Sequence, residues 1–141
     1  MKTAVDTNVF SALWSNEPGA SEMIALLGQA RNQGGVVVCG AVYAELLAHP
    51  KASSTFVDDF LLQTGVTVEF DLDERIWRDV ARAYAAYAQR RRRSGSTQAK
   101  RLLVDFVIGA HAVHRADRLL TLDAIRYVKD FPRLTLGPAR S

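Results

Sequence analysis

Four acidic residues of this 141-residue chain stand inside or directly beside apolar segments, where a solvated surface does not account for them. They are Asp6, Glu45, Asp105 and Asp123. Asp6 and Asp123 each come directly after an apolar stretch that predicts a β-strand, whereas Asp105 and Glu45 lie within apolar stretches that predict helices. Because an unpaired buried carboxylate is costly, side chains in such positions need a partner.

A divalent metal ion is the partner that this set of side chains favours. Strands of an α/β sheet bring the residues at their carboxyl ends to one edge, where several carboxylates repel each other unless a cation neutralises them. Hard cations such as Mg²⁺ or Mn²⁺ prefer oxygen ligands, and the chain has no Cys/His set that suits zinc. The four acids therefore predict a magnesium or manganese site.

Each acid taken alone also allows a plain structural interpretation. Asp6 can cap a following helix with the polar residues after it as turn residues, and Asp105 and Asp123 can be helix N-caps. Glu45 can pair with a basic neighbour such as Lys51. These alternatives stay open for single residues, but all four together on one α/β chain favour a metal site.

A basic tract gives the second indication. Nine of the 18 Lys and Arg residues lie between positions 75 and 101, with Asp79 as the only acid there. A basic face attracts phosphate-bearing partners, although a charge run can also be a solvated helix face. The interruption Ser94-Gly95-Ser96 predicts a mobile loop within this tract.

Strands and helices alternate along the sequence. We expect strands at 2–5, 36–39, 66–70, 118–121 and 133–136. Between them we expect a helix opened by residues 15–18 and ended by Gly34-Gly35, helices at 41–47 and around 56–61, a long helix capped by Asp73, a helix from Asp105 and a short helix from Asp123. This order predicts an α/β fold, a three-layer α/β/α sandwich around a mainly parallel sheet of four to five strands. The length fits one domain over residues 1–141.

The composition, 48% hydrophobic and 23% charged, is typical of a soluble globular protein. The apolar runs are too short to cross a bilayer, and the N-terminal residues do not form a signal peptide, so we expect a cytoplasmic protein without a membrane partner. The single cysteine, Cys39, lies in an apolar run and is expected to be a buried thiol.

Four segments of the sequence resemble the PIN-domain family, and within it the VapC-like toxins of bacterial and archaeal toxin–antitoxin pairs. They are Ala4-Val5-Asp6-Thr7-Asn8-Val9-Phe10, Tyr43-Ala44-Glu45-Leu46, Asp105-Phe106-Val107-Ile108-Gly109-Ala110-His111-Ala112 and Leu120-Thr121-Leu122-Asp123-Ala124-Ile125-Arg126-Tyr127. The resemblance covers essentially the whole chain. One departure is Leu122, which stands where the family often has a basic residue.

The resemblance implies a metal-binding, catalytic quartet of Asp6, Glu45, Asp105 and Asp123. The fourth acid is the most variable of the four in related proteins. The resemblance further implies that Thr7 or Asn8 supports the site through hydrogen bonds and that Thr121 orients the loop bearing Asp123. The family acts on RNA, and we expect six basic side chains to contact the phosphate backbone of an RNA substrate. They are Arg90, Arg91, Arg92, Arg93, Lys100 and Arg101.

The implied activity is a Mg²⁺- or Mn²⁺-dependent endoribonuclease that hydrolyses a phosphodiester bond to leave a 5′-phosphate and a 3′-hydroxyl. The three histidines are expected to have packing or surface roles, which speaks against a metal-free histidine ribonuclease. The toxin role implies a cognate antitoxin, a toxin homodimer, and inhibition of translation through cleavage of tRNA, rRNA or mRNA.

Two other functions are compatible with parts of the sequence. Aspartyl-phosphate phosphatases also begin with an aspartate after the first strand, but they use Asp-x-Asp, and here Asn8 takes the second position. A non-catalytic nucleic-acid- or partner-binding module on the same fold is the stronger alternative. Metal-dependent RNA cleavage distinguishes this module from the nuclease.

Overall fold

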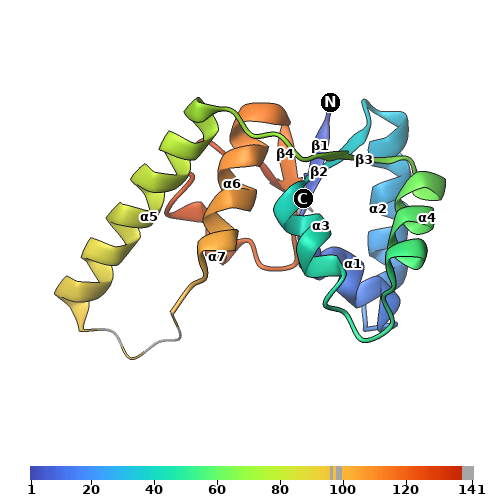
Figure 1. The fold of residues 1–141 in the computed structure, drawn as a ribbon, viewed down its shortest axis with the longest axis horizontal. Helices are drawn as coiled ribbons and strands as arrows, with labels where there is room; N and C mark the ends of the chain where they lie inside the picture. The colour runs from blue at the N-terminus through green and yellow to red at the C-terminus, as the bar shows by residue number, and fades with distance from the viewer. Residues whose placement is uncertain (96, 98–99, 138–141) are drawn as a thin grey trace.

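A five-stranded parallel sheet forms the centre of the protein (Figure 1). The computed structural model of the chain describes residues 1–95, 97 and 100–137. The strand order is β3-β2-β1-β4-β5, and every neighbouring pair is parallel. The strands are β1 (Thr3–Val5), β2 (Val36–Cys39), β3 (Val66–Glu69), β4 (Arg118–Leu120) and β5 (Leu136–Gly137). The prediction of a mainly parallel sheet of four to five strands is confirmed.

The central strands are buried because helices cover the sheet. All residues of β1 and β2 are buried, as expected for strands that face apolar surface on both sides. Thr3 of β1 pairs in register with Val36 of β2 and with Arg118 of β4, so β1 lies in the middle.

Seven helices in the described part of the chain flank this sheet, and they confirm the α/β sandwich. Figure 1 shows α5 and α6 packed on each other on one side of the strands, and α2 and α4 on the other. The helices are α1 (Thr7–Trp14), α2 (Ala20–Asn32), α3 (Gly40–Leu46), α4 (Ser54–Thr64), α5 (Glu74–Ser94), α6 (Leu103–Arg115) and α7 (Ile125–Val128).

Local sequence signals fix several of these boundaries. Asp73 accepts a hydrogen bond of 3.1 Å from the backbone N–H of Ile76 and so caps α5, as the sequence predicted. Gly65 ends α4 with a φ of 73°, a conformation that glycine adopts without steric cost.

Other boundaries differ from the sequence-based expectation. Helix α1 begins directly after β1, and the next helix opens at Gly19 rather than within residues 15–18. The fifth strand, expected at 133–136, begins only at Leu136, because a backbone hydrogen bond from Leu134 to Phe131 closes a turn there.

One tight packing contact joins α6 to the C-terminal part of the chain. A Cβ atom added to Gly109 of α6 would lie only 2.3 Å from the ring of Phe131, so the glycine permits this approach. Phe131 and Phe106 are both buried in the same core. The contact holds the segment after α7 against the helix that carries Asp105.

The predictions for the cysteine and for two of the histidines agree with the structure. Cys39 is a free, buried thiol, as predicted. His111 and His114 pair with Glu69 and Asp79 at 2.8 and 3.1 Å, which are packing and surface roles. No helix in the described residues is long and apolar enough to span a membrane.

Candidate acidic active site

The order of the strands has a switch point between β1 and β4. From β1 the chain builds the sheet outward through β2 to β3, and it then returns to place β4 on the opposite side of β1. At such a switch point the connections leave in opposite directions, and a crevice forms beyond the carboxyl ends of the two strands. Asp6 directly follows β1 and Thr121 directly follows β4, so both residues lie at this switch point.

Asp6 is buried and held by two hydroxyl groups. Its Oδ2 accepts hydrogen bonds from Thr121 Oγ1 at 2.9 Å and from the Tyr127 hydroxyl at 2.7 Å. The residue occupies the N-cap position of α1, yet its side chain makes no capping hydrogen bond. The plain capping interpretation is therefore wrong for Asp6.

Tyr127 is a site residue that the sequence analysis did not single out. Its side chain is fully buried, and its pKa is raised well above the ordinary value by burial and by the charge of Asp6. The hydroxyl therefore stays protonated and donates to the carboxylate. A lone aromatic residue most often belongs to the core, so its residue type did not indicate a role at the site. Only its position, four residues after Asp123, could have indicated that role.

Glu45 projects from α3 toward the start of α1. Thr7 Oγ1 donates a hydrogen bond of 2.5 Å to Glu45 Oε1, while Lys51 instead donates to the backbone carbonyl of Trp14. Burial raises the pKa of the Glu45 carboxyl; the hydrogen bond from Thr7 opposes this shift, and the charges of Asp6 and Asp105 add to it. Glu45 is therefore coupled to the other acids and not to Lys51.

Asp105 lies in the first turn of α6, and the N-cap of that helix is Leu102. Its pKa is raised by burial, against the opposing charges of Arg126 and Arg101, while Asp6 raises it further. Arg126 lies 3.3 Å from Oδ1 and Arg101 lies 3.8 Å from Oδ2. Asp105 is thus a largely buried carboxylate that two arginines partly neutralise.

Asp123 is more exposed than the buried Asp6 and Asp105, with 43% of its side chain accessible. It precedes α7, whose N-cap is Ala124, so Asp123 is not that helix's cap. Its backbone N–H donates to Thr121 Oγ1 at 3.1 Å, and its carboxylate pairs with Arg126 at 3.1 Å.

Asn8 ties the loop after β4 to the start of α1. Its side-chain amide donates to Thr121 Oγ1 at 3.4 Å, and its Oδ1 accepts from the backbone N–H of Leu122 at 3.2 Å. Thr7, Asn8 and Thr121, which the sequence analysis assigned to support, therefore contact the acids or the loop that carries Asp123.

The donor set suits a hard divalent cation. The charge of Asp6 raises the pKa of both Glu45 and Asp105, and a cation that neutralises these carboxylates relieves the repulsion. Within the described residues, no group of three or more His, Cys, Asp or Glu side chains has a metal-ligating arrangement. Hydroxyl groups and arginines hold the carboxylates instead, and Arg126 forms ion pairs with both Asp105 and Asp123.

The profile of the PIN domain matches residues 3–132 of the sequence. The chain belongs to the PIN-domain family. No curated protein matches its sequence.

Two solved structures share the fold of this PIN domain. VapBC2 from Rickettsia felis, bound to a DNA fragment from its promoter, aligns with a TM-score of 0.59 and 19% identity over 97% of this chain and 98% of that chain. VapBC-1 from nontypeable Haemophilus influenzae aligns with a TM-score of 0.60 and 20% identity over 97% of each chain.

The basic tract of this PIN domain divides into two parts. Arg90 and Arg101 both form ion pairs with the buried carboxylate of Asp130, and the Arg101 guanidinium lies 4.6 Å from the centre of the Phe106 ring. Two of the six side chains predicted to contact RNA are therefore engaged within the protein.

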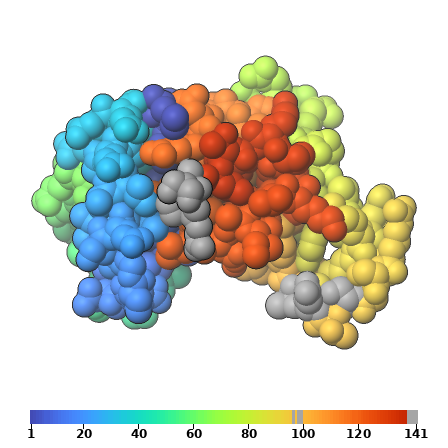
Figure 2. Space-filling view, turned by 180° about the vertical axis from the view of Figure 1, so that it is seen from behind, coloured from blue at the N-terminus to red at the C-terminus, as the bar shows by residue number. Residues whose placement is uncertain are grey.

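The other part surrounds a hollow of about 500 Å³ at the C-terminal end of α5, which projects from the body in Figure 2. Tyr84 and Tyr87 stack on each other there with their ring centres 6.3 Å apart. The basic side chains that line the hollow are Arg91, Arg92 and Lys100. Ser96 of the predicted loop lies outside the described residues.

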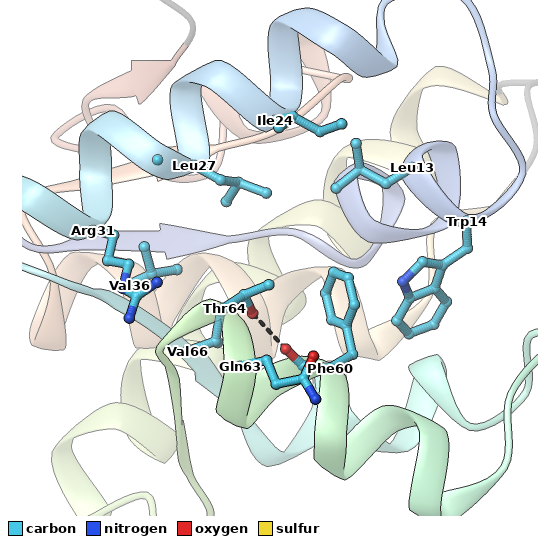
Figure 3. A pocket seen from close by; sticks show the side chains of 11 residues that line it. Leu13, Trp14, Ile24, Leu27, Arg31, Val36, Phe60, Gln63, Thr64 and Val66 are labelled. Atoms are coloured by element: carbon cyan, nitrogen blue, oxygen red, sulfur yellow. Dashed lines mark hydrogen bonds between the residues drawn. The ribbon is translucent and has the colours of Figure 1, made fainter.

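A second, apolar groove lies between α1, α2 and α4 (Figure 3). It has a volume of about 440 Å³, and Leu27 of α2 faces Phe60 of α4 across it. Trp14 of α1 lines the groove, and its buried Nε1 has no hydrogen-bond partner in the described part of the chain. Ile24, at the rim, is 61% exposed.

We expect Glu45→Gln to stabilise the metal-free protein at neutral pH. Because the folded-state pKa of Glu45 is raised above its ordinary 4.5, the folded state retains the proton longer than the unfolded state. Ionisation of Glu45 therefore lowers the free energy of unfolding as the pH rises through that window. Thermal unfolding in EDTA at pH 5 and pH 7.5 measures this loss, which is smaller in the variant.

Glu74→Gln is the matched control, since Glu74 is 76% exposed and lies far along the chain from the acids. It should change the pH dependence little. The prediction is contradicted if Glu45→Gln loses as much stability from pH 5 to pH 7.5 as the unmodified protein does.

Proposed function

We propose that this PIN domain is a metal-dependent endoribonuclease and the toxin of a VapC-like toxin–antitoxin pair, acting in the cytoplasm to inhibit translation. The observation that carries the proposal is the electrostatic coupling of Asp6, Glu45 and Asp105 at the switch point of the sheet. The similarity to the two VapBC structures supports the assignment to toxins.

In this proposal Asp6, Glu45, Asp105 and Asp123 hold Mg²⁺ or Mn²⁺. The bound metal lowers the pKa of a water molecule and neutralises charge that develops on the phosphate, so that hydrolysis leaves a 5′-phosphate and a 3′-hydroxyl. Thr121 and Tyr127 fix one oxygen of Asp6, and Thr7 fixes one oxygen of Glu45. These hydroxyl groups orient the two carboxylates for the metal, as the hydrogen-bond partners of metal ligands do in other metal sites.

The hollow at the end of α5 is the proposed contact for the RNA strand. Its cationic side chains suit the phosphate backbone, and the half-buried aromatic pair in its wall offers a surface on which unpaired bases stack. Arg91, Arg92, Arg93 and Lys100 carry this role. Arg90 and Arg101 act indirectly, because their ion pairs with Asp130 anchor both ends of the segment to the protein body.

The apolar groove between α1, α2 and α4 is the proposed docking site for the cognate antitoxin. An exposed apolar groove on a soluble domain is typical of a partner site, and its side chains suit the apolar face of an amphipathic helix. The homodimer remains a further prediction from the family resemblance, and sedimentation of the purified protein measures it.

The first test is cleavage of defined tRNA, rRNA and mRNA substrates by purified, antitoxin-free protein with Mg²⁺ or Mn²⁺. We expect cleavage to disappear in EDTA and to fall by about 100-fold or more in Asp6→Asn. Thr121→Val should lose about 10- to 100-fold, because it removes a group that orients Asp6.

Asp117→Asn is the control for these substitutions, because Asp117 accepts a hydrogen bond from Lys2 at the opposite ends of the strands. It should retain full activity. Absence of cleavage by folded protein across all three RNA classes would instead favour the non-catalytic binding module.

The second test concerns the basic hollow. Arg91→Gln/Arg92→Gln should weaken RNA binding and reduce the slope of log K against log salt by about 1.4, since each lost phosphate contact on a single strand contributes ~0.7. Arg75→Gln/Arg78→Gln removes the same charge from the other end of α5 and serves as control. Equal slopes in both double variants would exclude the hollow as the RNA contact.

The third test concerns the groove. Ile24→Glu places a charge at its rim and should weaken binding of the purified cognate antitoxin by about tenfold or more, because the charge loses its water in the complex. Leu62→Glu, at a 79% exposed position of α4 outside the groove, is the control. Both variants should still cleave RNA; unchanged affinity of Ile24→Glu for the antitoxin contradicts the proposal.

A further inference from the structure

One arginine bridges two acids of the site. Arg126 lies in α7, and its two terminal nitrogens reach different carboxylates: Nη1 lies 3.3 Å from Asp105 Oδ1 and Nη2 lies 3.1 Å from Asp123 Oδ2. These two acids come from separate elements, the first turn of α6 and the loop after β4. A single guanidinium thus takes the bridging position between two of the four acids.

The two arginines at Asp105 differ in how firmly they are held. Arg101 is fixed by its ion pair with Asp130 and by the Phe106 ring, and only 19% of its side chain is exposed. Arg126 is 36% exposed, and in the described part of the chain its side chain pairs only with Asp105 and Asp123. Arg126 can therefore leave the site by rotating its side chain into solvent, whereas Arg101 cannot.

Arg126 and a divalent cation exclude each other at these oxygens. Both are positive, both need the lone pairs of Asp105 and Asp123, and like charges at such close range repel strongly. Without either cation, Asp105 would keep only Arg101, 3.8 Å away, and Asp123 would have no ion-pair partner in the described residues. Arg126 therefore supplies the positive charge that both carboxylates share when no metal ion is bound.

We propose that Arg126 is an exchangeable counter-ion of the acidic site: it holds Asp105 and Asp123 in the metal-free protein and is displaced when the divalent metal binds. The inference rests on the proposed metal-dependent function. Arg126 is a positioning residue in this scheme. It keeps the two acids in place for the metal, and competition from its guanidinium lowers the affinity for that metal.

The test is calorimetric titration of Mn²⁺ into the metal-free full chain without RNA. Arg126→Gln should bind Mn²⁺ about tenfold more tightly than the unmodified protein, since the competing cation is gone. Arg126→Lys keeps the charge and should stay closer to the unmodified protein. Arg133→Gln, an exposed position without an ion pair in the described residues, controls for net charge and should change the affinity by less than about twofold.

Thermal unfolding provides a second readout. In EDTA, Arg126→Gln should unfold at a lower temperature than the unmodified protein, and added Mn²⁺ should raise its unfolding temperature by a larger increment. Unchanged or weaker Mn²⁺ binding by a folded Arg126→Gln overturns the counter-ion inference while the metal-dependent function stands. Absence of Mn²⁺ binding by the unmodified protein overturns both.

Discussion

Mutual repulsion among carboxylates at one edge of the sheet is the constraint on which this structure depends. The topology brings Asp6, Glu45 and Asp105 close enough that the charge of Asp6 raises the pKa of the other two carboxyls, in surroundings that exclude part of the water. Three kinds of compensation surround them: hydroxyl groups that donate hydrogen bonds, a fixed arginine and a displaceable one. Thr7 belongs to α1, and Tyr127 and Arg126 belong to α7, whereas Thr121 lies just after β4 and Arg101 just before α6.

The buried Asp130 has a comparable organising role away from the acids. It receives Arg90 from the end of α5 and Arg101 from the segment before α6, so it fixes both ends of the connection that carries the basic tract. Its own position depends on Phe131, which packs where Gly109 leaves room. Packing in the core therefore determines where the basic hollow lies relative to the acidic crevice.

Much of this could be predicted from the sequence, for definite reasons. Alternating apolar strands and amphipathic helices indicated a parallel α/β sheet, and carboxylates directly after strands pointed to its carboxyl edge. The roles of Tyr127 and Arg126 could not be predicted, since each depends on a tertiary contact with Asp6 or Asp105. The pairing of Arg90 and Arg101 was missed for the same reason: charge counts along a chain do not reveal a buried partner such as Asp130.

Helix α1 connects the acidic site, where we propose that RNA is cleaved, with the apolar groove, where we propose that the antitoxin docks. Its first residue, Thr7, contacts Glu45 in the acidic crevice, and its last, Trp14, lines the apolar groove. Eight helical residues span only about 12 Å. A peptide whose helix lies in the groove thus needs about four more residues in extended conformation to cover that length. One short continuous segment can therefore occupy the groove and reach the acidic site at the other end of α1, without any change in the shape of the PIN domain.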